Sequence, residues 1–342
     1  TPAEEARLER DAPVDSEAYE LYLRAVHMMR GLAMGRGLYE LRDLLKRSVE
    51  ADANFAPAWA LYGRTCRVIA KYLKDDVEAN QLEAKRAFDW AFELDPESPI
   101  THNLFTYYQL EEMGDSRGAM LRLLDRVSEG TADANLWAGL VPTLRFLGLY
   151  DASLAAHNRA IALDPQIATS YIHTHLQRGE YEVVVNVAKS PLIRASALAM
   201  DGQEDAAIAL VEASEEEEGT GIRDFYGTAL RAGIFKDAAL AEQSVRTAME
   251  EGIWDPEAGY FFAHIAGRVG LHDLALDVIR RAVARGFYPV GPLKIDPWLV
   301  GARQEPGFDE VWETAVAGRN EALEAFKAAR GEKILGVTEE PL

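Results

Sequence analysis

The stretch ANLWAGLVPTLRFLGLYDASLAAHNRAIALDP, residues 134–165, holds two apolar helical patterns separated by a short turn. In the first pattern, Trp137 and Val141 recur at the spacing that places side chains on one face of a helix. Gly148 follows, and glycine often ends a helix because it adopts the left-handed conformation without strain. The second pattern runs to Pro165, which cannot continue a helix. The stretch therefore predicts a helical hairpin.

Similar hairpins recur along most of the chain. Glycines that close the first helix of a hairpin are Gly114, Gly148, Gly179, Gly202, Gly233 and Gly270. The first two lie 34 residues apart, which is the tetratricopeptide (TPR) period. Each such hairpin needs its neighbours to bury its apolar face. We predict an all-α fold, a right-handed superhelical solenoid of tandem TPR-like repeats with a C-terminal capping helix.

The predicted solenoid divides the chain into four segments. Residues 1–16 lead into the repeats, and residues 17–288 form about eight TPR-like hairpins. Spacing is irregular over residues 179–219, where we expect a bend. Residues 289–330 hold a proline-rich segment and an apolar stripe that predicts the capping helix. Residues 331–342 are expected to form a flexible tail.

The tryptophans are expected to support this packing. We expect four of them to fill gaps between repeats and two to belong to the cap. The gap-filling residues are Trp59, Trp90, Trp137 and Trp254, and the cap residues are Trp298 and Trp312.

Composition narrows the classes of partner. The 342 residues carry 36 basic and 56 acidic side chains, a formal net charge of −20. Nucleic acid is not an expected partner, because phosphate binding needs a basic surface. Anionic membrane surfaces would also be repelled. Cys66 is the only cysteine, so neither an intramolecular disulfide nor a cysteine-based metal motif can form, and no cofactor is expected.

Membrane insertion is not expected either. No stretch approaches the ~18 consecutive apolar residues of a membrane-spanning helix, and the first residues lack the pattern of a signal peptide. The expected location is cytoplasmic, with a periplasmic location as the alternative if a membrane-spanning segment precedes the chain. The start at Thr1 favours a fragment of a longer polypeptide or a processed product.

Two segments resemble a known family. Residues 14–24, VDSEAYELYLR, resemble the entry into the C-terminal TPR modules of bacterial signalling proteins. The segment DPWL at 296–299, with Arg303, Pro306 and Phe308, is similar to the close of the same modules. In those proteins an adenylate cyclase, serine/threonine kinase or winged-helix domain precedes the repeats. The resemblance implies the docking or regulatory part of such a protein.

Motifs for catalysis are not apparent. The chain has no phosphate-binding Gly-Lys-Ser/Thr loop, no Gly-x-Ser-x-Gly elbow and no His-Glu-x-x-His pair. His173 and His175 are two residues apart, so on a helix they point to different faces and cannot easily share a metal ion. We therefore expect neither a catalytic residue nor a metal site.

The concave groove of the solenoid is the predicted binding site. The residues that alignment on the glycines places there are Arg64, Arg67, Tyr108, Glu111, Arg145, His173, Arg223, His264 and Arg268. Arginine presents a fork of donors that suits carboxylates, which favours an acidic peptide or protein as partner. The alternative is that these arginines pair with acids on adjacent helices.

The sequence supports three functional hypotheses. The leading one is a non-catalytic protein-interaction scaffold. The second is a self-association module that forms a homodimer, through its cap or the irregular residues 179–219, and so dimerises an attached domain. The third, a small-molecule sensor or enzyme, requires a deep pocket with converging polar groups, which no motif indicates.

Overall fold

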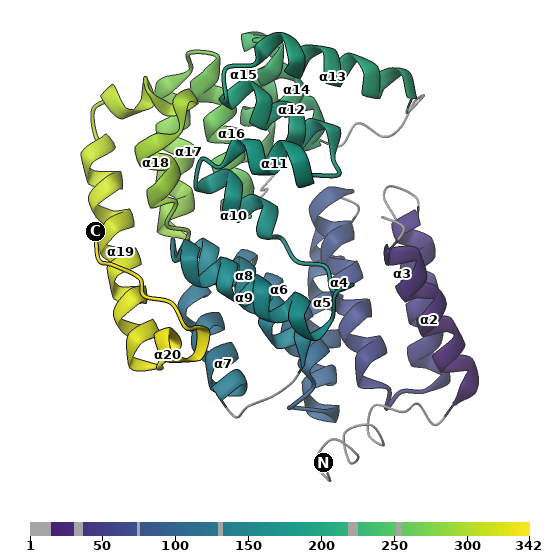
Figure 1. Cartoon of the computed structure of the whole chain (residues 1–342). Helices are drawn as coiled ribbons and strands as arrows, with labels where there is room; N and C mark the ends of the chain where they lie inside the picture. The colour runs from purple at the N-terminus through teal and green to yellow at the C-terminus, as the bar shows by residue number, and fades with distance from the viewer. Residues whose placement is uncertain (1–14, 31–36, 74–75, 129–132, 218–224, 251–254) are drawn as a thin grey trace. The chain divides into compact units, whose positions relative to one another are not determined.

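Helices form all the regular structure in the described part of the chain (Figure 1). The computed structural model describes residues 15–30, 37–73, 76–128, 133–217, 225–250 and 255–342. Over these residues it contains nineteen α-helices and two short 3₁₀-helices, which confirms the all-α prediction. None of the helices in those ranges combines the length and apolar character needed to cross a membrane. The contacts divide the chain into unit 1, residues 1–108, and unit 2, residues 109–342.

Unit 1 contains two packed hairpins. The first pairs α2 (Ser16–Arg30) with α3 (Gly37–Ala51), and the second pairs α4 (Ala56–Tyr72) with α5 (Val77–Leu94). Gly63 permits the close approach of α4 and α5, because a Cβ there would lie 3.1 Å from the Ala84 carbonyl oxygen. Helix α6 (Pro99–Glu111) begins in unit 1 and ends in unit 2.

Unit 2 continues with consecutive pairs of helices. The pairs α8/α9, α10/α11, α12/α13, α14/α15 and α16/α17 each pack together as adjacent hairpins, as predicted. Their helices, with α7 before them, are α7 (Ser116–Ser128), α8 (Ala134–Phe146), α9 (Tyr150–Leu163), α10 (Tyr171–Gln177), α11 (Tyr181–Val187), α12 (Pro191–Met200), α13 (Glu204–Glu217), α14 (Phe225–Ile234), α15 (Ala238–Glu250), α16 (Pro256–Arg268) and α17 (His272–Ala284). The short α10 and α11 lie where the repeat spacing is compressed.

Five of the six predicted hairpin glycines have the left-handed conformation. They are Gly114, Gly148, Gly179, Gly202 and Gly270, with φ between 67° and 88°. The prediction for Gly233 is wrong, because this residue lies inside α14 and Lys236 adopts the left-handed conformation instead, with φ 56°. Gly233 serves close packing, since a Cβ there would lie 3.3 Å from Ile265 Cγ2.

The chain after α17 packs back on earlier hairpins. It contains α18 (Val290–Ile295), the 3₁₀-helices η1 (Pro297–Leu299) and η2 (Ala302–Gln304), α19 (Phe308–Ala328) and α20 (Gly331–Leu335). Helix α19 contacts α17 and α18 but also α7, and α20 contacts α7 and α9 (Figure 1). The tandem hairpins are thus present in unit 2, and α19 packs both on the last hairpin and on α7 earlier in the chain.

Residues 285–299, which we call the strap, pass the turns that follow α6, α8 and α10. A Cβ at Gly114 would lie 3.3 Å from the Arg285 carbonyl oxygen, and one at Gly148 would lie 2.8 Å from that of Tyr288. A Cβ at Gly179 would lie 2.8 Å from the side chain of Ile295. These glycines thus combine a left-handed turn with room for the strap.

The strap also donates hydrogen bonds to carbonyl groups at the ends of two helices. The Tyr288 amide donates to the Phe146 carbonyl oxygen in the last turn of α8, at 2.7 Å. The Arg285 guanidinium donates to the Glu111 carbonyl oxygen at the end of α6, at 2.6 Å. Carbonyl groups at helix ends have no partner within the helix, so these bonds fasten the strap to two first helices.

Residues 331–342 differ from the expected flexible tail. They form α20 and an extended segment that places Glu339 in a buried position, 5% exposed. Gly336 adopts the left-handed conformation between the two parts, with φ 72°.

Candidate binding surface

Arg145 lies at the centre of a buried polar cluster in unit 2. Its Nε and Nη2 donate to the two carboxylate oxygens of Glu257 on α16, at 2.6 and 2.8 Å. Its Nη1 donates to the carbonyl and hydroxyl oxygens of Ser170, and Gln177 also donates to Glu257. Arg145 is fully buried, so the structure does not expose it to a groove. Arg145 thus pairs with an acid, as in the alternative interpretation, but that acid lies on α16, which is not adjacent to α8 in the chain.

His264 is likewise fully buried, beneath the strap. Its ring stacks on Trp298 with 4.6 Å between centroids, and its Nδ1 lies 3.5 Å from the Asp296 carboxylate. The same carboxylate accepts hydrogen bonds from the Tyr260 hydroxyl at 2.6 Å and the Trp298 amide at 2.8 Å. Asp296 is the N-cap residue of η1, and His264 packs against Trp298 in that helix.

Arg268 also contacts Trp298 in η1. Its guanidinium lies 4.4 Å from the centre of the Trp298 ring, and its Nε donates to the Gly233 carbonyl oxygen. An ion pair of 3.2 Å joins it to Glu204 at the start of α13. Arg268 therefore connects α14, α13 and η1.

Among the other predicted residues of unit 2, His173 is linked to the His264 cluster by Phe261, whose ring lies 5.7 Å from that of His264. The His173 ring contacts Phe261 edge to face, with centroids 5.6 Å apart. Glu111 is 4% exposed, and its carbonyl oxygen accepts from Arg285. Arg223 lies outside the described residues.

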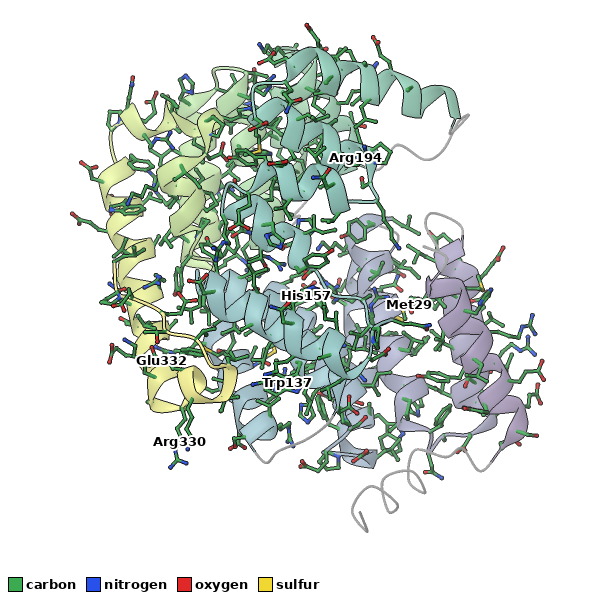
Figure 2. The ribbon with its side chains drawn as sticks, viewed as in Figure 1. Met29, Trp137, His157, Arg194, Arg330 and Glu332 are labelled. Carbon is green, nitrogen blue, oxygen red and sulfur yellow. The ribbon has the colours of Figure 1, made fainter. Side chains whose placement is uncertain are left out.

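The predicted residues of unit 1 also make local contacts. Arg64 Nη1 lies 3.2 Å from the sulfur of Met29, in the last turn of α2 (Figure 2). Arg67 is 5% exposed, and its guanidinium lies 5.8 Å from the centre of the Tyr107 ring. Tyr108 packs on aromatic rings of α5 and α6. The proposed groove thus stays a sequence-based prediction.

A different surface of unit 1 presents aromatic side chains to solvent. It surrounds the turn between α3 and α4, where the buried ring of Phe55 contacts those of Tyr19 and Tyr22 on α2. The indole N–H groups of Trp59 and Trp90 both donate to the Ala53 carbonyl oxygen in this turn, at 2.8 and 3.1 Å. We define Tyr19, Tyr22, Phe55, Trp59 and Trp90 as the aromatic surface.

Tyr19 and Trp90 of the aromatic surface are far more exposed to solvent than a tryptophan in the core of unit 2. Tyr19 is 45% exposed and Trp90 is 42% exposed, whereas Trp137 in unit 2 is 8% exposed. Trp137 fills a core position as predicted. Trp90 contacts the turn of the preceding hairpin but keeps much of its ring exposed, and Trp254 lies outside the described residues. Leu23 and Leu82, on α2 and α5, are also about half exposed, at 47% each.

The spacing of apolar residues in α5 indicates that Trp90 lies off the buried face of the helix. The buried residues of α5 include Ala84, Ala87 and Ala91, which share one helical face. Trp90 precedes Ala91 by one residue, a rotation of about 100° around the helix, so it leaves that face. Aromatic residues alone do not reveal this, because they are usually buried.

Helix α5 also carries an exposed ion pair near Trp90 in sequence. Lys85 and Asp89 form an ion pair of 2.6 Å on α5, and both side chains are more than half exposed. Across the described residues, no group of three or more His, Cys, Asp and Glu side chains is arranged to hold a metal ion. The aromatic surface offers apolar area and two indoles that are oriented by hydrogen bonds.

Comparison with known proteins gives no family. No protein-family model matches the chain, and no curated protein matches it significantly. The observed fold is that of an all-helical protein with paired adjacent helices.

Proposed function

We propose that this chain is a non-catalytic protein-interaction scaffold of the TPR type, and that its partner docks on the aromatic surface of unit 1. The observation that carries the proposal is the exposed pair Tyr19 and Trp90 beside the α3–α4 turn. Tryptophan and tyrosine are enriched among residues that dominate binding energy at protein interfaces. The paired helices and the 34-residue spacing of Gly114 and Gly148 support the TPR type.

The orientation of the indoles strengthens this assignment. Trp59 and Trp90 hold their N–H groups on one carbonyl oxygen, that of Ala53, so both side chains have limited freedom before a partner arrives. Preorganised side chains lose little conformational entropy on binding, which favours affinity. The ring of Phe55 packs edge to face against that of Tyr19, which also limits the freedom of Tyr19.

The resemblance of residues 14–24 and 296–308 supports a more specific role, the docking or regulatory part of a bacterial signalling protein. In that role the partner is another protein or a peptide. Self-association through the same aromatic surface is the alternative, and light scattering of the purified chain separates the two. A concentration-dependent dimer that Trp90→Ala abolishes favours self-association, whereas a monomer favours a different partner.

Peptide selection provides the test. Peptides from a random library are selected on the wild-type chain, and their affinities are measured for Trp90→Ala and for Leu163→Ala. Leu163 is a matched control, because it is 45% exposed but lies on α9 in unit 2. We expect at least ~10-fold weaker binding to Trp90→Ala, since an interface tryptophan often contributes about 2 kcal/mol or more. Unchanged affinity in Trp90→Ala, or an equal loss in Leu163→Ala, would contradict the proposed surface.

A further inference from the structure

The N-terminus of α9 lacks a cap from its own sequence. Its N-cap residue is Leu149, which makes no side-chain capping bond. The first amides of a helix have no partner within the helix, and a side-chain oxygen normally accepts from one of them. Here the Ala152 amide donates to Glu339 Oε1 at 3.0 Å, across 187 residues of sequence.

Arg319 and Asn320 on α19 bind the same extended segment. Arg319 is 4% exposed and lies 3.3 Å from Glu339 Oε2, and its Nη1 donates to the Glu340 carbonyl oxygen at 2.6 Å. The side-chain amide of Asn320 donates to the Leu342 carbonyl oxygen at 3.1 Å and accepts from the Leu342 amide at 3.2 Å. Two neighbouring side chains thus contact the backbone at alternate residues.

Helix α20 provides a further contact. Glu332, labelled in Figure 2, accepts a hydrogen bond from the Glu339 amide at 3.4 Å. The segment is therefore held by one buried side chain, Glu339, and by bonds to its backbone. This is the way in which peptide-binding domains hold an extended ligand, with backbone bonds for affinity and a pocket for one side chain.

Little apolar area holds the segment in place. Thr338, Glu340, Pro341 and Leu342 are exposed, and Val337 is half-buried. Gly336, in the left-handed conformation, connects the segment to α20. Net contributions of single hydrogen bonds are modest, so a segment that buries one side chain fully and a second only partly is weakly held compared with a core element.

We propose that the α9 N-terminus, Arg319 and Asn320 form a receptor site for an extended peptide carrying a glutamate, and that residues 337–342 occupy it as an intramolecular ligand. A tethered ligand has an effective concentration on the order of millimolar, so it blocks a weaker peptide in trans. An external peptide with additional contacts displaces it. The site lies in unit 2 and is independent of the aromatic surface of unit 1.

The experiment uses the segment itself as a probe. A labelled synthetic peptide with the sequence of residues 336–342, GVTEEPL, is titrated by fluorescence anisotropy into the full chain and into a variant that ends at Val337. We expect binding to the shortened variant and at least ~10-fold weaker binding to the full chain, whose site is occupied. Absence of binding to the folded shortened variant would overturn the proposal.

The neighbouring glutamates provide matched peptides. Glu339 is buried, whereas Glu340 is exposed and contributes only its carbonyl oxygen to Arg319. A peptide with alanine at position 339 is expected to bind about tenfold more weakly, the effect of losing a bond to a charged group. Alanine at position 340 is expected to have no effect. Equal affinity of both peptides for the shortened variant would show that no glutamate pocket exists.

Amide exchange in the full-length Glu339→Ala variant provides a second test that does not depend on folding of the shortened variant. In Glu339→Ala, exchange of the Ala152 amide is expected to become at least ~10-fold faster. Exchange in α12 and α13, which do not contact the segment, should stay at the wild-type rate. Faster exchange throughout unit 2 would instead assign the segment a purely structural role and contradict the proposal.

Discussion

Arg145 on α8 and Glu257 on α16 form a buried bidentate ion pair across 112 residues of sequence, with N–O distances of 2.6 and 2.8 Å. The pair joins two hairpins that are not consecutive. Its existence explains why Arg145, which the repeat alignment assigns to an open groove, has no access to solvent.

Removing one partner of this pair should strongly destabilise unit 2. Arg145→Met leaves the Glu257 carboxylate buried beside Gln177 without its main counter-charge, and such changes typically cost about 3–5 kcal/mol. Combining Arg145→Met with Glu257→Met should recover much of that loss, because no buried charge then remains. Lys85→Met is the surface control, since exposed pairs contribute about 0–1 kcal/mol. Urea unfolding of the wild type, Arg145→Met, Glu257→Met, the double variant and Lys85→Met measures these differences. Additive losses in the double variant would contradict the account of the pair.

The strap contact predicts different costs for two glycines of the same conformation. Gly148 and Gly202 both have positive φ, 69° and 82°, so alanine is strained at either position. Only at Gly148 would the new Cβ meet the strap, 2.8 Å from the Tyr288 carbonyl oxygen, while nothing lies within 4 Å at Gly202. Gly148→Ala should therefore cost at least ~1 kcal/mol more than Gly202→Ala. Thermal unfolding measures the difference, and equal costs would show that the strap does not approach Gly148 this closely.

Much of the local architecture could be predicted from the sequence, because glycine, proline and apolar spacing act over a few residues. The hairpin turns at Gly148 and Gly179 and the Asp296 cap follow from such local rules. The return of α19 to α7 depends on contacts between residues far apart in sequence, which no local pattern encodes. That return explains the packing of Glu339 against Arg319, and the Arg145–Glu257 pair likewise joins residues 112 positions apart. The sequence raised pairing of the arginines with acids as an alternative, but it did not identify either of these partners.

Cys66 should react slowly with thiol reagents in the folded chain. Burial in unit 1 raises the pKa of its thiol to about 11. At pH 8 the reactive thiolate is then roughly a thousandth of the total. Labelling with an aromatic disulfide at pH 8 should be slow, and it should become fast in denaturant. Equally fast labelling in both states would show that the core around Cys66 opens readily.

Docking of residues 337–342 should depend on pH. Burial raises the pKa of the Glu339 carboxyl above its ordinary value of 4.5, although the Ala152 amide and Arg319 act in the opposite direction. A raised pKa in the docked state means that docking is strongest below pH 4.5 and weakens as the pH rises through the raised value. Protection of the Ala152 amide, corrected for intrinsic exchange, should thus increase from pH 7 to pH 5.

Glu339→Gln is the control for this titration, because glutamine accepts the Ala152 hydrogen bond but does not ionise. Its protection should not change over the same pH range. A loss of wild-type protection in mild acid would show that the ion pair with Arg319 outweighs the cost of burial.

Hydrogen–deuterium exchange of the chain bound to a library-selected peptide tests the central claim, that partners dock on the aromatic surface, most directly. The account predicts slower exchange on binding at residues 53–59 and in α5 around Trp90. Slower exchange confined to α8, α10 and α16, with residues 53–59 unchanged, would contradict it and favour the groove predicted from the repeats.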